Sequence, residues 1–220
     1  KKYDLIMDEE IAIIDLKTRN AKIINFFIVN KKILVILILL FLAFIFTFLG
    51  YDNYKKNIKI KIADEYNTTT TNFISANKKD VKKELIRIVG TKDKTYSPLA
   101  LYFLIDNNIL DEIDEINQLF DLIINKVKLE KEVKNLIIYK KALFNSDFNT
   151  ENELIEILKP ITNSESIWRS HGLYLLGEYF YHKGEKQKSK DFYIKILSLE
   201  NSNPQIKLQA QKRLSRDIGE

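Results

Sequence analysis

The longest apolar run of the chain lies near its N-terminal end. Ile33–Leu49 contains a single polar side chain, Thr47, and no charged residue. A helix rises ~1.5 Å per residue, so a run of this length covers most of a ~30 Å hydrocarbon core. A buried core helix rarely lacks charge over this length. A cleaved signal peptide has a shorter apolar region, of about 7–15 residues, followed by small residues. The pattern therefore predicts an uncleaved transmembrane helix over residues 33–51.

Basic residues flank this predicted span on both sides. Within about 20 residues of its ends, five precede it and four follow it: Lys17, Arg19, Lys22, Lys31 and Lys32, then Lys55, Lys56, Lys59 and Lys61. Cytoplasmic loops carry the excess of Lys and Arg, so the small difference favours an N-terminus inside the cell. Residues 1–32 are then a cytoplasmic N-terminal segment, in which Ile23–Val29 suits a short apolar helix at the membrane interface. Tyr51 and Tyr54 suit the opposite interface.

Beyond the span, an apolar residue recurs at every fourth position. Tyr54, Ile58, Ile62 and Tyr66 form this stripe, and lysines lie between them. The spacing predicts an amphipathic helix, the first of the juxtamembrane helices expected over residues 52–90. The stripe either packs on its own domain or forms a seam for a partner helix or a second copy of the chain. The sequence leaves both interpretations open.

The rest of the chain reads as short helices with clear end signals. Thr150 and Glu153 form a capping box, and Pro98 and Pro204 occupy first turns, where a missing N–H costs nothing. No run alternates long enough to predict a strand, so the expected fold class is all-α. The expected helices span 80–89, 97–104, 110–124, 131–144, 151–158, 168–183, 186–199 and a last one from 204. Their expected apolar faces include Ile113, Ile116, Phe120 and Ile123 in one helix, and Val133, Leu136, Ile137 and Leu143 in the next.

Three of these helices begin near Pro98, Lys131 and Trp168, at intervals of 33 and 37 residues. Each is followed by a shorter partner, and two helices in about 34 residues is the tetratricopeptide spacing. In the unit that starts at Trp168, Gly177 and Ser189 take the small positions where the two helices would cross. The other matching positions are Leu173, Leu176, Phe180, Gly184, Tyr193 and Ile196. We therefore expect a tetratricopeptide-like domain over residues 91–220.

The helix predicted over 168–183 also carries the candidate binding residues. His171, Tyr174, Glu178, Tyr181 and His182 share a stripe beside the expected packed face. In tetratricopeptide repeats such a stripe lines the concave groove. Tyrosine combines apolar area with a hydrogen-bonding tip, which suits an extended peptide or a helical partner. The alternative is that Tyr174 and Tyr181 cover the neighbouring repeat.

Composition excludes several kinds of chemistry. The chain has no cysteine, which excludes disulfides and Cys-ligated zinc, and its six glycines are too scattered for a phosphate-binding loop. His171 and His182 would lie roughly 16 Å apart on one helix, too far to share a metal ion. The acidic set of Asp111, Glu112, Asp114 and Glu115 suits the positive end of a helix dipole. The segment beyond the span is nearly neutral, so we expect no nucleic-acid partner. We also expect no cofactor, no metal and no enzymatic activity.

The order of these parts resembles the YfgM-like family, ancillary subunits of the SecYEG translocon. An acidic patch, Asp8-Glu9-Glu10, precedes the basic stretch, the single span and the repeats, and the better-matching pieces are residues 95–100 and 168–188. Bulky Ile and Leu replace the family's more Ala-rich helix interiors. The resemblance implies a bacterial inner-membrane protein with a cytoplasmic N-terminus and a periplasmic repeat domain. It also implies binding beside the translocon, together with a membrane-anchored periplasmic prolyl isomerase. A structural tether for another envelope complex and a membrane-anchored enzyme are the alternatives.

Overall fold

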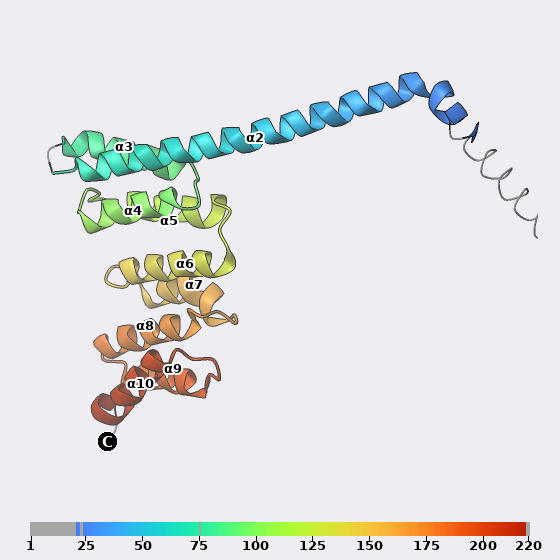
Figure 1. Ribbon diagram of the computed structural model, residues 1–220. Helices are drawn as coiled ribbons and strands as arrows, with labels where there is room; N and C mark the ends of the chain where they lie inside the picture. The colour runs from blue at the N-terminus through green and yellow to red at the C-terminus, as the bar shows by residue number, and fades with distance from the viewer. Residues whose placement is uncertain (1–20, 23, 75, 219–220) are drawn as a thin grey trace, which may run out of the picture. The chain divides into compact units, whose positions relative to one another are not determined.

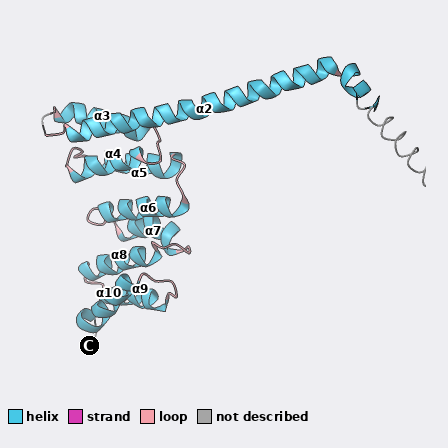
Figure 2. Ribbon diagram, in the orientation of Figure 1, coloured by secondary structure: helices cyan, strands magenta, loops and turns pink. Residues whose placement is uncertain are grey.

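The computed structural model describes residues 21–22, 24–74 and 76–218. Over these ranges the chain forms helices, turns and loops without any strand (Figure 2), so the all-α prediction is confirmed for this part of the protein. The acidic patch Asp8-Glu9-Glu10, together with Lys17 and Arg19, lies outside the described residues. The contacts divide the chain into two units, with the boundary between Ile60 and Lys61.

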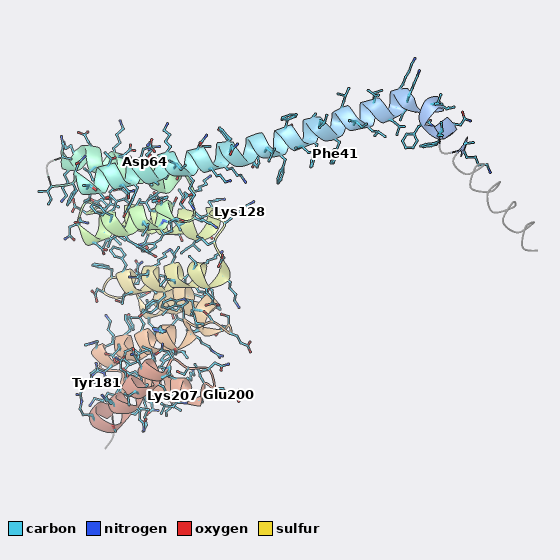
Figure 3. All side chains as sticks on the ribbon, in the orientation of Figure 1. Phe41, Asp64, Lys128, Tyr181, Glu200 and Lys207 are labelled. Atoms are coloured by element: carbon cyan, nitrogen blue, oxygen red, sulfur yellow. The ribbon has the colours of Figure 1, made fainter. Side chains whose placement is uncertain are left out.

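The first unit contains the predicted span. Helix α2 (Lys31–Thr71) is, by length and composition, long and apolar enough to cross a membrane, and its apolar segment is not buried inside the protein. The side chains around Phe41 project outward from this helix (Figure 3), and Phe41 itself is exposed. A contiguous exposed apolar surface of this extent marks a membrane or a partner surface.

The second unit begins with the last turns of α2 and continues as a run of short helices in which each contacts the next (Figure 1). Contacts also join the alternate helices α6, α8 and α10. The described helices are α3 (Lys78–Gly90), α4 (Tyr96–Asp106), α5 (Ile113–Lys126), α6 (Lys131–Asn145), α7 (Glu151–Thr162), α8 (Arg169–His182), α9 (Lys186–Ser198) and α10 (Pro204–Arg213), followed by a π-helical turn, η1 (Leu214–Ile218).

The helix ends follow the expected local chemistry. The Glu153 carboxylate accepts hydrogen bonds from the backbone N–H and the hydroxyl of Thr150, both at 2.8 Å, which completes the capping box of α7. The Asn203 side chain caps α10 and accepts from the N–H groups of Gln205 and Ile206 at 3.0 and 3.2 Å. Gly184 ends the turn after α8 with φ of +78°, a conformation that glycine adopts without steric cost.

The core of the second unit is a series of three clusters rather than one. The first runs from Ile62 in α2 through α3, α4 and α5 to Ile137 in α6. The second joins α6, α7 and α8 around Phe180, and the third joins α8, α9 and α10 around Tyr193. Each cluster draws on helices that follow one another in the chain, so burial is local in sequence, as in stacked helical arrays.

The apolar face predicted for α5 is mostly right, whereas that of α6 is mostly wrong. In α5, Ile116, Phe120 and Ile123 are buried, and Leu119 joins them. In α6, Ile137 is buried, but Val133 and Leu143 are 40% and 46% exposed and Leu136 is half-buried.

Two amides, Asn135 and Asn145, occupy the buried side of α6 in their place. Asn135 donates to the Ser166 hydroxyl at 3.0 Å, and Asn145 exchanges hydrogen bonds of 2.8 and 2.9 Å with Asn117. These partners lie on other segments of the chain and offset the cost of burying an amide.

Helix α7 also runs further than predicted. It was expected to end at Leu158, but it continues through Pro160 to Thr162. The proline lies in the last turn, and Leu158 and Ile161 on either side of it are both buried. Packing of these two side chains in the core outweighs the hydrogen bond that Pro160 cannot donate.

The juxtamembrane stripe divides into two parts. Ile62 is only 7% exposed and belongs to the core of the second unit, and the Tyr66 ring lies 5.6 Å from that of Tyr96. The interpretation that the stripe packs on its own domain is therefore confirmed for these two residues. Tyr54 and Ile58, which belong to the first unit, are exposed.

Candidate functional site

The packed face of α8 is the one that the sequence predicts. Leu173, Leu176, Gly177 and Phe180 are all buried. Phe180 lies in the cluster shared with α6 and α7, and its ring stacks on Phe192 of α9 with centroids 5.5 Å apart. This face fixes the orientation of α8, and with it the directions in which the five candidate binding residues point.

Helices α8 and α9 cross closely at Gly177. A Cβ atom on Gly177 would lie 2.6 Å from Cε1 of the buried Tyr193 ring. The Ser189 hydroxyl, also buried, donates to the Gly177 carbonyl at 2.8 Å. The two small residues therefore act as predicted: they let the helices approach until a ring fills the space above a glycine.

Glu178, the residue that follows Gly177, is the centre of a polar network. Its carboxylate accepts hydrogen bonds from the Tyr193 hydroxyl at 2.6 Å and from Arg213 Nε at 2.8 Å. Arg213 also donates through Nη2 to the second carboxylate oxygen, so the guanidinium binds Glu178 in a bidentate manner. The network joins α8 to α9 and α10, and charge-assisted forked bonds of this kind are among the stronger polar contacts in proteins.

The network changes the acidity of its members. Burial alone would raise the pKa of Glu178, but hydrogen bonds from Arg213, Tyr193 and Tyr174 outweigh it and lower that pKa. Burial, followed by the hydrogen bond to Glu178, raises the pKa of Tyr193. Glu178 is thus ionised and Tyr193 neutral around pH 7.

Each of the two candidate tyrosines contacts a side chain of the Glu178 network. The Tyr174 ring is half-buried, with its centroid 5.7 Å from that of Tyr193. The Tyr181 ring lies beneath the Arg213 guanidinium, 5.0 Å from its centroid, at a distance typical of a cation–π contact. The structure therefore brings Tyr174, Glu178 and Tyr181 together around Arg213, where α10 occupies part of the predicted stripe.

His171 lies at the other end of α8, in an aromatic cluster with α6. Its ring centroid is 5.1 Å from that of Trp168 and 5.9 Å from that of Tyr139, and Tyr139 stacks on Trp168. Burial lowers the pKa of His171. The imidazole is therefore neutral at physiological pH and acts as an aromatic side chain between two helices.

His182 is the one fully exposed member of the candidate set. It lines an open cavity of about 410 Å³ on α8, next to the turn that follows α6. The cavity wall combines apolar, acidic and basic groups: Leu175, Tyr179, Glu178, Asp147, Ser146 and Lys183. A surface with this mixture can take both the side chains and the backbone of a peptide segment.

A second cavity lies at the opposite end of α8. It has a volume of about 590 Å³ and is lined by residues 165–167, Arg169 and residues 198–201. Ile167 at its edge is exposed, although it is a large apolar side chain. The sequence did not predict this cavity, because the two walls of the cavity come from the loops before α8 and after α9.

Among the described residues, no group of three or more His, Asp or Glu side chains could hold a metal ion. Asp114 and Glu115 lie in the first turn of α5, as expected for carboxylates at the positive end of a helix dipole. Glu115 also forms an ion pair of 2.7 Å with Lys82 of α3.

The chain was compared with protein families, curated proteins and solved structures. No family model matches the chain, and neither a curated protein nor a solved structure matches it. Over the described residues, the fold and site define a class: a helical chain with one helix long and apolar enough to cross a membrane, and a second unit of short helices that carries open cavities.

The sequence did not predict two residues that complete the site. Arg213 lies 35 positions after Glu178, and Tyr139 lies in a different helix from His171. The position of Tyr193 as a buried aromatic was predicted, but the bond from its hydroxyl to Glu178 was not. No local spacing of residues in the sequence predicts such pairs, because they depend on which helices pack together.

Proposed function

We propose that this chain is a single-pass bacterial inner-membrane protein whose periplasmic helical domain binds other proteins. Helix α2 supplies the anchor, and residues 91–220 form a tetratricopeptide-like domain. The proposed role is that of an ancillary subunit of the Sec translocon, acting with a membrane-anchored periplasmic prolyl isomerase. The proposal assigns no catalytic residue and no cofactor.

The crossing of α8 and α9 carries the repeat part of this proposal. Gly177, Ser189 and the buried Tyr193 give the close two-helix contact that such repeats use, and Gly184 supplies the tight turn between the helices. The helix that follows, α10, again contacts both α8 and α9. A further helix stacked on a helix pair is the arrangement by which repeats bury their apolar faces.

A recurring tyrosine supports equivalent positions in successive helix pairs. Tyr66, Tyr102, Tyr139 and Tyr174 follow one another at intervals of 36, 37 and 35 residues, on α2, α4, α6 and α8. Each is partly buried, and burial raises the pKa of each, to about 12 for Tyr102. A residue of one type and one environment, repeated at about 36 positions, is the signature of a repeated unit.

The binding face that we propose centres on the cavity at His182. Tyr174, Glu178 and Tyr181 are engaged by α9 and α10, whereas His182 and Lys183 are exposed beside Leu175 and Tyr179. A partner segment placed there would meet apolar surface as well as charges of both signs. Glu178 also lines this cavity, so its network would hold one wall of the face in place.

Site-specific photocrosslinking in living cells tests this proposal. A photoreactive residue in place of His182 should give adducts with translocon subunits or with the prolyl isomerase. The matched control replaces Ile194, which is exposed on α9 away from the cavity, and should not give those adducts. If adducts form only with division or wall-synthesis proteins, the chain is a structural tether of another complex. If a folded protein gives no adduct at position 182, the proposed face is wrong.

The exposed part of the juxtamembrane stripe gives the proposal a second element, self-association. Tyr54 and Ile58 are 63% and 41% exposed. A second copy of α2 would cover them. Cysteine introduced at Ile58 should then form a disulfide-linked dimer in membranes, and cysteine at the neighbouring Lys59 should form much less; equal yields at both positions would contradict a defined seam.

A further inference from the structure

We propose that Lys55, Lys56 and Lys59 bind the phosphate groups of anionic membrane lipids. These side chains lie on α2 directly after its apolar segment, and all three are exposed. The inference rests on the proposed membrane span, since it requires α2 to cross the bilayer. It adds a lipid-recognition site that the anchor alone does not imply.

The position of the lysines along α2 matches the level of the headgroups. From Lys32 at one end to Lys55 at the other, the helix advances roughly 35 Å at ~1.5 Å per residue. The hydrocarbon core is ~30 Å thick, and the headgroup layers bring the bilayer to about 40–45 Å. A helix that crosses the bilayer therefore places Lys32 and Lys55 in opposite headgroup layers.

The contact between Lys55 and Tyr51 directs one of the charges toward this layer. The Lys55 Nζ atom lies 4.6 Å from the centroid of the Tyr51 ring, one turn nearer to the apolar segment. Tyrosine rings concentrate at the membrane–water interface. The ammonium therefore lies at the level of an interfacial ring.

The three lysines share one side of the helix. Successive residues of an α-helix are rotated by about 100°, which places positions 55, 59 and 56 within roughly 100° of its circumference. Lys55 and Lys59 are neighbours in the i, i+4 relation, with Cβ atoms about 5–6 Å apart, a spacing that one phosphodiester can bridge.

The charge balance of this stretch is positive. Residues 51–60 contain these three lysines and a single acidic residue, Asp52, so the formal charge is +2. Lys61 is not counted because it belongs to the second unit. A basic cluster beside a span attracts anionic headgroups by about 1 kcal/mol per lysine, or about fivefold in binding for each.

Native mass spectrometry of the full-length chain tests the inference. The protein in detergent is mixed with equal amounts of phosphatidylglycerol and phosphatidylcholine, and the bound lipids are counted. The wild-type chain should retain the anionic lipid preferentially. In the triple variant Lys55→Gln, Lys56→Gln, Lys59→Gln, the ratio of bound phosphatidylglycerol to bound phosphatidylcholine should fall by at least about tenfold. The control Lys126→Gln, Lys128→Gln, Lys190→Gln removes the same charge from exposed sites on the helical domain and should keep it.

Two outcomes would overturn the inference: a wild-type chain without preference for phosphatidylglycerol, or a triple variant that keeps it. Carbonate extraction of membranes separates this failure from a failure of the span. A chain that stays in the membrane pellet but shows no lipid preference has the anchor and lacks the lipid site. A chain that carbonate releases has no transmembrane anchor, and the proposed function fails with it.

Discussion

Arg213 of α10 forms an ion pair with Glu178 of α8, 35 positions earlier in the chain. The side chains are only 23% and 20% exposed, so the pair is shielded from solvent more than a surface salt bridge. The same guanidinium covers the Tyr181 ring. One residue near the C-terminal end therefore holds α10 on the face where the sequence predicted a binding groove.

Removing one partner of this pair should destabilise the helical unit. Arg213→Ala leaves Glu178 as a poorly compensated, partly buried charge, and we expect a loss of about 1–3 kcal/mol in the free energy of unfolding. The single tryptophan, Trp168, stacks on Tyr139 and can report unfolding of this unit by fluorescence in urea. Lys159→Ala breaks an exposed pair with Glu156 and serves as the control, expected to change the free energy by less than about 1 kcal/mol. Equal effects of the two variants would contradict a structural role for Arg213.

The stability that Glu178 contributes should depend on pH with a defined sign. Its pKa in the folded protein is lowered from the ordinary value of 4.5, so the folded state favours the ionised carboxylate. That contribution is fully present above pH 4.5 and is lost as the pH falls through the lowered pKa. The difference in unfolding free energy between wild type and Glu178→Gln should therefore be constant from pH 8 to pH 6 and shrink below about pH 4. A difference that grows on acidification would show the opposite sign and refute the assigned pKa shift.

Gly177→Ala should disrupt the crossing of α8 and α9. The added methyl group would lie 2.6 Å from the Tyr193 ring, and that ring is fully buried with little room to move. We expect a loss of about 1–3 kcal/mol, even though alanine favours a helix over glycine by about 1 kcal/mol. Gly90→Ala is the matched control, because a Cβ atom there meets nothing within 4 Å. Gly90→Ala should be neutral or stabilising. If both variants change the free energy of unfolding in urea equally, the close crossing does not contribute to stability.

Protease accessibility should reveal on which side of the membrane the helical unit lies. We expect protease added to spheroplasts to digest residues 52–220, and inverted vesicles to protect them, since the proposal places this segment in the periplasm. Trypsin suits the test because lysine and arginine are abundant after the span. Protection in spheroplasts combined with digestion in inverted vesicles would reverse the topology.

The positions of the helices were largely predictable, because helix ends depend on neighbouring residues. Thr150 and Glu153 cap α7, and Asn203 with Pro204 starts α10, through bonds that span two or three residues. The interior of α8 was predictable for the same reason, since an apolar face repeats at the period of the helix. The apolar segment of α2 follows from composition alone, as Ile33–Leu49 carries no charge.

The partners of the candidate residues were decided by the tertiary structure alone. Asn135 and Asn145 take core positions in α6 that apolar periodicity assigned to Val133 and Leu143, because Ser166 of the loop before α8 and Asn117 of α5 reach them. Arg213 likewise converts Glu178 from a candidate contact residue into the centre of a network between helices. Sequence determines local geometry and which residues can be buried, whereas the choice among polar partners depends on how distant helices stack, and only the folded chain brings those groups within hydrogen-bonding distance.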